Sequence, residues 1–261
     1  MKKNNLKEKL KAGQVALGSW NVIPSASIVE IAGNSGLDFI IIDSEHGPIG
    51  FETAEDMARA AKAAGITPIM RVPANEPHLI LKALDIGSSG VQVPHISTKK
   101  DAKAAAESAK YYPKGKRGLS PFTRAAQYGM GEKTHVEDSN ENAMVILNVE
   151  GVEGIKNLKQ IATVPDVDVI FIGPYDLSQS IGKPGQVYDP KVINSIKDSV
   201  KIIRKNNMAC GSFARDKQYL KVLIDCGVQY ITYMVDSAMI SESYCDMRSI
   251  FNKLITGKGR K

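Results

Sequence analysis

Cysteine is scarce in this chain of 261 residues, and long apolar segments are missing. The spacing of Cys210, Cys226 and Cys245 matches no zinc or redox motif, and an odd number argues against a disulfide framework. We therefore expect a reduced protein, for which the cytoplasm is the simplest location. No apolar run approaches the roughly 18–20 residues that span a membrane, so we expect no membrane partner.

Two sequence signals are also absent. The N-terminal segment is charged and lacks the apolar stretch of a secretory signal. The chain contains neither the GxGxxG nor the GxxxxGK[ST] fingerprint, which argues against the common loops that hold dinucleotides or nucleoside triphosphates.

The net charge is weakly basic, at +6 from 34 basic and 28 acidic side chains. Much of the excess lies at the two ends, and the interior has no dense basic run with interleaved aromatic residues. We therefore predict solvated, frayed termini and no nucleic-acid partner. The basic residues at the ends are Lys2, Lys3, Lys7, Lys9, Lys11, Lys258, Arg260 and Lys261.

Short apolar runs rich in β-branched residues recur along the chain, and longer helical patterns follow them. Nearly continuous apolar runs are typical of parallel strands that are buried on both faces. The runs cover residues 15–20, 38–43, 67–72, 91–93, 144–150, 167–172, 208–213 and 229–235. The helical patterns cover residues 25–33, 51–64, 77–84, 99–110, 152–163, 190–205, 216–226 and 237–255.

This alternation predicts βαβ units. Eight units in about 250 residues indicate an α/β protein with a closed (β/α)8 TIM barrel, as a single domain over residues 1–261. An open, doubly wound sheet is the alternative. The connection over residues 111–142 is long and without a clear period, so we expect it to be functional or partly folded.

Polar residues stand where the predicted strands end, which in a TIM barrel is the side of the active site. Carboxylates without cysteine and with few histidines form an oxygen-donor set that suits Mg²⁺ or Mn²⁺. The strand-end residues are Trp20, Asp43, Ser44, Glu45, His46, Arg71, Asn148, Glu150, Asp176 and Asp236.

Each candidate also has a structural interpretation. Glu150 could stabilise a helix N-terminus, and Asp43 or Asp176 could cap a turn. His46 could be an exposed loop residue, and Arg71 could form a purely structural ion pair. We interpret His78 and His135 as surface residues and leave His95 open.

Six ordered segments resemble the HpcH/HpaI family of class II pyruvate aldolases over nearly the whole chain. They are DFIIIDSEHGP, PIMRVP, GVQVPHI, GKRGLSPFTRAAQYG, ILNVEG and FIGPYDLS. The resemblance implies that Glu150 and Asp176 hold the metal and that Arg71 contacts the keto oxygen of pyruvate. It also implies a catalytic dyad of His46 and Asp43.

The resemblance further implies that backbone N–H groups around Tyr175 and Asp176 hold the pyruvate carboxylate. It implies a homo-oligomer, usually a hexamer, in which C-terminal helices pack together. Many members carry Gln-x-Glu where this chain has Asn148-Val149-Glu150, so the contact made by the longer amide is in doubt. We count Trp20, Asn148, Tyr175 and Asp176 as substrate-binding candidates.

These residues predict a metal-dependent aldolase that forms or cleaves 4-hydroxy-2-oxo acids through a pyruvate enolate. Mg²⁺, Mn²⁺ or Co²⁺ would act as a Lewis acid, and Arg71 would add positive charge at the developing oxyanion. A Schiff-base mechanism needs a lysine in the barrel, and none of the predicted strands contains one. The alternatives are a related carbon–carbon lyase acting on a CoA thioester or oxaloacetate, and a barrel that only binds. The aldehyde partner stays open.

Overall fold

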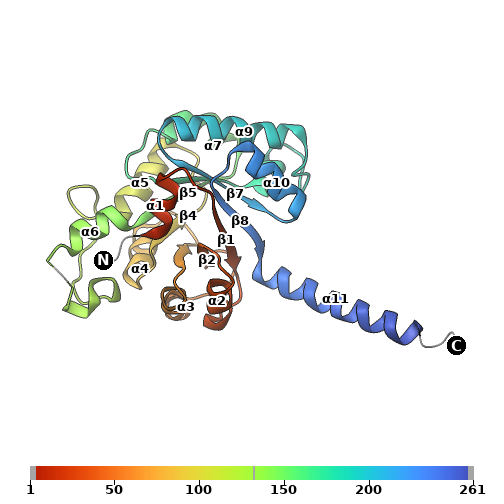
Figure 1. Ribbon diagram of the computed structural model, residues 1–261. Helices are drawn as coiled ribbons and strands as arrows, with labels where there is room; N and C mark the ends of the chain where they lie inside the picture. Colours follow the sequence, from red (N-terminus) through yellow and green to blue (C-terminus); the bar gives the residue numbers. More distant parts are fainter. Residues whose placement is uncertain (1–3, 132, 258–261) are drawn as a thin grey trace.

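The strands of the computed structural model, which describes residues 4–131 and 133–257, form one closed parallel barrel (Figure 1). Each strand pairs in parallel with the next, and the last pairs with the first. The predicted TIM barrel is confirmed, and the open sheet was the wrong alternative. The strands are β1 (Ala16–Asn21), β2 (Phe39–Asp43), β3 (Thr67–Arg71), β4 (Gly90–Val93), β5 (Met144–Val149), β6 (Val169–Ile172), β7 (Ala209–Ala214) and β8 (Tyr230–Val235).

Helices alternate with these strands, and the eight that the sequence predicts lie within a few residues of their predicted bounds, whereas α1, η1, α6 and α8 were not predicted. Their ends follow local chemistry: the Ser25 side chain accepts from the N–H of Ile28, and Gly227 ends a helix in the left-handed conformation. The helices are α1 (Asn5–Lys11), α2 (Ala26–Asn34), α3 (Phe51–Ala63), α4 (Pro77–Asp85), α5 (Lys99–Ala109), η1 (Arg124–Gly129), α6 (His135–Asn142), α7 (Val152–Ile161), α8 (Pro174–Ser180), α9 (Pro190–Lys205), α10 (Lys217–Cys226) and α11 (Asp236–Gly257).

Alternation along each strand divides the core into two parts. Ile40 and Ile42 of β2 pack outward against the helices, whereas Phe39 and Ile41 pack inside the barrel. The same period places Asp43 on the inner side, at the carboxyl end of its strand. In this way the strands carry polar side chains to the mouth of the barrel while their central residues remain apolar.

Helix α1 closes the opposite end of the barrel, and this corrects the prediction of a frayed N-terminus. Leu6 and Leu10 are buried in the inner core, and Lys7 forms an ion pair with Asp168 at 2.9 Å. Lys9 contacts Asp38 at 2.6 Å. Lys11 ends α1 with an exposed side chain, and the other terminal residues of that prediction, Lys2, Lys3, Lys258, Arg260 and Lys261, lie outside the described part of the chain.

The long connection over residues 111–142 is partly folded and holds η1 and α6. Lys110 fastens it, because its buried amine donates to the carbonyls of Asn140 at 2.8 Å and Ala143 at 2.6 Å. Tyr111 and Asn140 exchange two further hydrogen bonds, backbone to side chain, at 2.7 and 3.1 Å. Polar contacts therefore hold a segment that lacks an apolar period.

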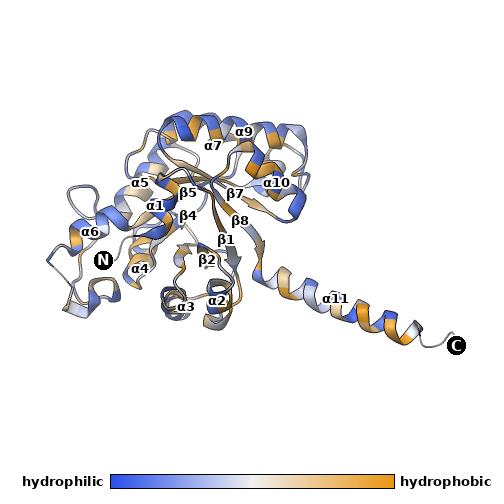
Figure 2. Ribbon diagram, viewed as in Figure 1, coloured by the Kyte–Doolittle hydropathy of each residue, from blue (hydrophilic) through white to orange (hydrophobic). Residues whose placement is uncertain are grey.

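Helix α11 leaves the barrel and extends away from it, with apolar residues spread along its length (Figures 1 and 2). None of the helices within the described ranges is both long and apolar enough to cross a membrane. The exposed apolar side chains of α11 are Met239, Ile240, Tyr244, Met247, Ile250, Phe251, Leu254 and Ile255.

Replacing Lys110 with methionine tests the buried amine. Burial lowers the pKa of Lys110 from 10.5 to about 8, and the side chain is only 1% exposed. Between pH 8 and 10.5 the Lys110 amine is protonated in the unfolded chain and largely neutral in the folded one. The contribution of Lys110 to the free energy of unfolding therefore rises with pH across this range. The expected gain across the window is up to about 3 kcal/mol.

Urea unfolding at pH 7.5, 9 and 10 measures this effect as the difference between wild type and Lys110→Met. The difference should shift in favour of wild type as the pH rises. Lys62 is present in both proteins, so its own titration cancels. A difference that stays constant with pH would contradict the prediction.

Candidate functional site

Arg71, at the end of β3, is held by two carboxylates. Asp43 is its register partner on β2, and the two side chains meet at Nε–Oδ1 2.8 Å and Nη2–Oδ2 2.5 Å. A second ion pair joins Arg71 Nη1 to Glu45 Oε2 at 2.8 Å, although no N–H points directly at this buried oxygen. A guanidinium that ends a buried strand needs such partners, because an unpaired charge would be costly there.

Trp20 covers one face of this guanidinium. The Arg71 Cζ atom lies 4.3 Å from the centre of the Trp20 ring, a cation–π arrangement. The indole N–H donates to Thr232 on β8 at 2.9 Å, and the ring meets Phe171 edge to face. The structure thus gives Trp20 a positioning contact with Arg71, and its predicted contact with substrate stays a prediction.

His46 lies in the turn after β2, with an exposed side chain. Asp43 Oδ1 accepts from the backbone N–H groups of Glu45 at 3.0 Å and His46 at 3.3 Å. Within residues 4–131 and 133–257, no hydrogen bond or ion pair joins the Asp43 carboxylate to the His46 ring. The structure therefore shows Asp43 as a clamp for Arg71 and for this turn, while the predicted dyad stays a prediction.

Glu150 is positioned by a chain of buried amides. Tyr230 Oη donates to Gln92 Oε1 at 3.2 Å, and Gln92 Nε2 donates to Asn148 Oδ1 at 2.8 Å. Asn148 Nδ2 in turn donates to Glu150 Oε1 at 2.8 Å. The Asn148 amide therefore accepts from Gln92 and donates to Glu150, so it orients Glu150, and its predicted contact with substrate stays a prediction.

Glu150 and Asp176 lie on the same side of Gly173. A Cβ atom placed on Gly173 would come within 3.0 Å of Glu150 Cγ and 3.5 Å of Asp176 Oδ2. Burial raises the pKa of Glu150, and the charges of Asp176 and Glu45 act in the same direction. The hydrogen bond from Asn148 and the nearby His95 oppose this rise. Crowded negative charge of this kind favours a cation.

Tyr175 and Asp176 belong to the first turn of α8, which begins at Pro174 directly after β6. Backbone N–H groups in the first turn of a helix have no acceptor within it, so they can bind an anion. The Tyr175 side chain is partly exposed and packs near Phe213 of β7. The predicted carboxylate-binding segment therefore borders the same mouth.

His95 and Glu45 join the site, and neither received a role from the sequence. His95 Nε2 lies 2.9 Å from Glu45 Oε1, and its Nδ1 lies 3.3 Å from Glu150 Oε2. His95 has a positive φ of 58°, and its side chain is 73% exposed. A doubly protonated ring would donate to both carboxylates. Gln92 was also missed, although a glutamine in the apolar run GVQV is a usable signal.

The arrangement combines a fixed guanidinium with a pair of carboxylate oxygen donors. Such donors fit Mg²⁺ or Mn²⁺, which retain water and substrate as further ligands. No group of three or more His, Cys, Asp or Glu side chains among the described residues is arranged to hold a metal. Glu150 and Asp176 are therefore a two-ligand candidate, which leaves positions for substrate oxygens.

Comparisons with known proteins agree on one family. The sequence model of the HpcH/HpaI aldolase/citrate lyase family matches residues 17–242. A hydroxypyruvate/pyruvate aldolase of Sagittula stellata is 34% identical, over 91% of this chain and 94% of its own length.

Two solved structures match almost the full chain. A family protein from Burkholderia cenocepacia superposes with a TM-score of 0.90 at 30% identity, covering 97% of this chain and 99% of its own. The citrate synthase SbnG superposes with a TM-score of 0.86 at 32% identity, covering 96% of this chain and 98% of its own.

Asp43→Asn tests the clamp on Arg71. The substitution keeps the shape of the side chain but removes the charge that faces a buried guanidinium. Glu45 still balances the guanidinium charge, so we expect the free energy of unfolding to fall by about 1.5–3 kcal/mol, the usual contribution of a hydrogen bond to a charged group. Urea denaturation at pH 7 measures it.

Asp225→Asn is the matched control, because Asp225 pairs with Lys221 at 3.0 Å on the exposed surface. That variant should lose no more than about 1 kcal/mol. Equal losses in the two variants would show that the buried clamp has no special role in stability.

Proposed function

The chain belongs to the HpcH/HpaI aldolase/citrate lyase family, and on that premise we propose that it is a metal-dependent aldolase acting through a pyruvate enolate. It would form and cleave 4-hydroxy-2-oxo acids. The observation that carries the proposal is a chain of contacts at the mouth of the barrel. Arg71 pairs with Glu45, His95 joins Glu45 to Glu150, and Asp176 lies beside Glu150 at Gly173. The aldolase name of a relative at 34% identity supports it.

We assign the metal to Glu150 and Asp176. Their oxygen donors suit Mg²⁺, Mn²⁺ or Co²⁺, and the raised pKa of Glu150 reflects burial and negative neighbours that a cation would offset. A bound divalent ion would supply Lewis acidity at the keto oxygen. The hydrogen bond from Asn148 fixes one Glu150 oxygen, and the other, which lies 3.3 Å from His95 Nδ1, would face the ion.

Arg71 would stabilise the negative charge that grows on the keto oxygen as a methyl proton leaves pyruvate. Its guanidinium is already oriented by Asp43 and Trp20, so little reorganisation is needed when charge develops. The free N–H groups of the first α8 turn, at Tyr175 and Asp176, would hold the pyruvate carboxylate. Together these contacts would define the bound orientation of the keto acid.

His46 is the proposed acid or base for the aldol hydroxyl. Its exposed side chain can approach substrate from the turn after β2, and histidine changes its charge near neutral pH. His95, between Glu45 and Glu150, would orient these acids. A Schiff-base route has no support within the described strands, since none of them contains a lysine.

A second candidate function is condensation of oxaloacetate with the enolate of a CoA thioester, in place of an aldehyde with the enolate of pyruvate. The likeness to a citrate synthase at 32% identity favours this alternative. Both reactions would stabilise an enolate at the same mouth and would differ in donor and acceptor. Parallel assays with pyruvate plus glyceraldehyde and with acetyl-CoA plus oxaloacetate, the second followed by release of CoA, distinguish the two.

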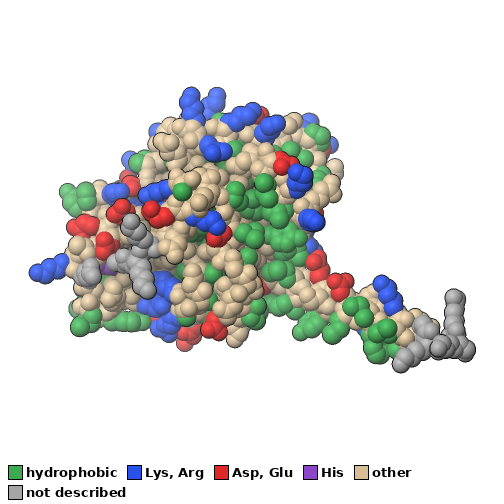
Figure 3. Space-filling model, viewed as in Figure 1, with side chains coloured by type: hydrophobic (Ala, Val, Ile, Leu, Met, Phe, Trp, Pro, Cys, Tyr) green, Lys and Arg blue, Asp and Glu red, His purple; other side chains and the backbone are tan. Residues whose placement is uncertain are grey.

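We also propose that residues 1–261 act as one domain in a homo-oligomer, a hexamer as the resemblance implies. The apolar side chains of α11 stand exposed on a helix that extends away from the barrel, and a second copy could cover them (Figure 3). The three cysteines are free, with Cys245 exposed, which fits the cytoplasmic location that we propose.

Metal dependence is the direct test of this function. After treatment with EDTA, retro-aldol activity and exchange of the pyruvate methyl protons should be lost, and Mg²⁺, Mn²⁺ or Co²⁺ should restore both. Glu150→Gln should weaken Mn²⁺ binding in calorimetry by a factor of ten or more, on the order of 1.4 kcal/mol, because it removes a charged ligand.

Glu153→Gln is the control, since Glu153 is an exposed carboxylate one turn further along the chain. His46→Ala should retain Mn²⁺ affinity while turnover falls by roughly 10²–10⁴-fold. Full activity after exhaustive chelation, or a pyruvate adduct trapped by borohydride, would overturn the metal mechanism.

The substitution Arg71→Lys distinguishes a catalytic role of Arg71 from a purely structural one. Lysine keeps the charge but lacks the planar fork that meets Asp43 at two atoms. We expect kcat/KM to fall by roughly 10²-fold or more, with Mn²⁺ affinity retained. Pyruvate proton exchange and Tm should be measured on the same preparation. A lowered Tm with exchange preserved in the folded fraction would make Arg71 a purely structural residue.

A further inference from the structure

A cavity of about 730 Å³ lies at the opposite end of the barrel from the proposed active site. Its lining includes Thr67, the first residue of β3, and Ser88 and Ser89, which precede β4. Arg71 and Gln92 stand toward the other ends of the same two strands. The volume is in the range that accommodates small-molecule ligands. The cavity is therefore separate from the mouth that holds Glu150 and Asp176.

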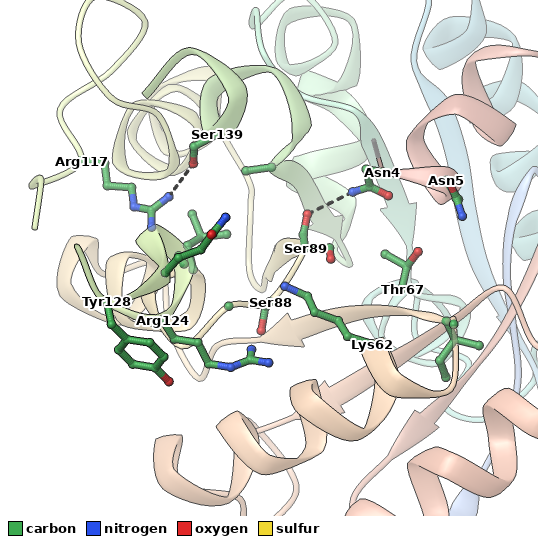
Figure 4. A pocket seen from close by; sticks show the side chains of 17 residues that line it. Asn4, Asn5, Lys62, Thr67, Ser88, Ser89, Arg117, Arg124, Tyr128 and Ser139 are labelled. Atoms are coloured by element: carbon green, nitrogen blue, oxygen red, sulfur yellow. Dashed lines mark hydrogen bonds between the residues drawn. The ribbon is translucent and has the colours of Figure 1, made fainter. Parts of the chain in front are cut away.

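Positive charge dominates this cavity. Lys62 of α3, Arg117 and Arg124 line it, and its lining contains no acidic side chain among the described residues (Figure 4). Asp85 pairs with Arg117 at 2.6 Å. Across residues 4–131 and 133–257, no carboxylate pairs with Lys62 or Arg124. Two cations in one hollow are left without a counter-charge.

Lys62 and Arg124 influence each other. The Lys62 side chain remains accessible within the cavity, but the surrounding protein lowers its pKa to about 8, and the charge of Arg124 contributes to this. In the close-up, the hydroxyl of Ser88 lies between the Lys62 amine and the Arg124 guanidinium (Figure 4). Repulsion between like charges is the condition that an anion would relieve.

Two buried donors also lack partners. Ser88 Oγ and Arg117 Nε have no hydrogen-bond partner, and Ser88 is only 6% exposed. Leaving a buried polar group unpaired is costly, so these groups either meet water or a ligand. Both residues line the cavity. An oxyanion could accept from the Ser88 hydroxyl and from the two cations at once.

The position of Arg124 is built into the backbone. Its Nη1 donates to the carbonyl of Ile86 at 3.0 Å. Gly87 has a φ of +93°, a backbone conformation that favours glycine, and a Cβ atom there would lie 2.3 Å from Arg124 Nη1 and displace the guanidinium. The turn at Ile86 and Gly87 therefore holds the Arg124 guanidinium in place at the cavity.

We propose that this cavity binds a phosphoryl group, carried by a small phosphate monoester, through Lys62, Arg124 and Ser88. A dianion matches two unpaired cations, and guanidinium and ammonium groups are the usual phosphate donors in proteins. The cavity is larger than a phosphate ion requires, which favours an ester over free phosphate. The inference is independent of the proposed aldolase function, because the two sites lie at opposite ends of the barrel.

Calorimetry on the full chain tests the proposal, with glycerol 3-phosphate and inorganic phosphate as probes at constant ionic strength, without metal or pyruvate. Wild type should show saturable binding of glycerol 3-phosphate. Lys62→Gln and Arg124→Gln should each weaken the affinity tenfold or more, on the order of the contribution of one charged hydrogen bond. Lys62→Arg, which keeps the charge, should retain most of it.

Lys100→Gln is the control, because it removes one exposed positive charge from α5, outside the cavity. It should leave the affinity unchanged. Ser88→Ala should weaken binding without lowering the Tm of the unliganded protein, since it removes a hydroxyl that has no partner. This last variant separates a ligand contact from a role in folding.

The outcomes decide the proposal directly. Tighter binding of glycerol 3-phosphate than of inorganic phosphate supports a phosphoryl site for a small ester. Equal binding of the two supports a phosphoryl site that also takes the free ion. Absence of saturable binding to wild type overturns the proposal. Equal weakening in Lys100→Gln, or none in Lys62→Gln and Arg124→Gln, also overturns it, because binding would then follow overall charge.

Discussion

A single buried guanidinium organises the mouth of this barrel. Arg71 ends an otherwise apolar strand, and the charge can stay there only because Asp43 and Glu45 surround it and Trp20 covers one face. These contacts tie together β1, β2, β3 and the turn that carries His46. The same interaction that makes the charge tolerable also fixes its direction, which is what a preorganised oxyanion site needs.

A second set of contacts crosses the barrel interior. Tyr230 of β8 reaches Gln92 of β4, and from there the amides continue through Asn148 to Glu150. Asn148 stands where the resemblance implies glutamine in many members. In this protein Gln92 donates to Asn148 from the neighbouring strand, and Asn148 donates to Glu150.

The sequence predicted the barrel because its strands are almost continuously apolar and its helices carry clear periods and caps. It also located most polar residues of the mouth, since each follows the end of a strand. The partners of those residues could not be predicted: Asp43 meets Arg71 only through the register of β2 and β3. His95 reaches Glu45 and Glu150 because its backbone is in the left-handed conformation, and no sequence pattern predicts that conformation at a histidine. Helix α1 was missed because its seven residues are short and rich in lysine.

Helix α1 has a consequence for how the chain folds during synthesis. It precedes every strand of the barrel in the sequence, yet Asn4 bonds to the carbonyl of Asn142, 138 residues later, and Lys7 pairs with Asp168. Leu6 and Leu10 therefore remain exposed to solvent until strands from the middle of the chain have been synthesised and can bury them. Closing the base of the barrel is thus a late event, which couples the start of the chain to the synthesis of β5 and β6.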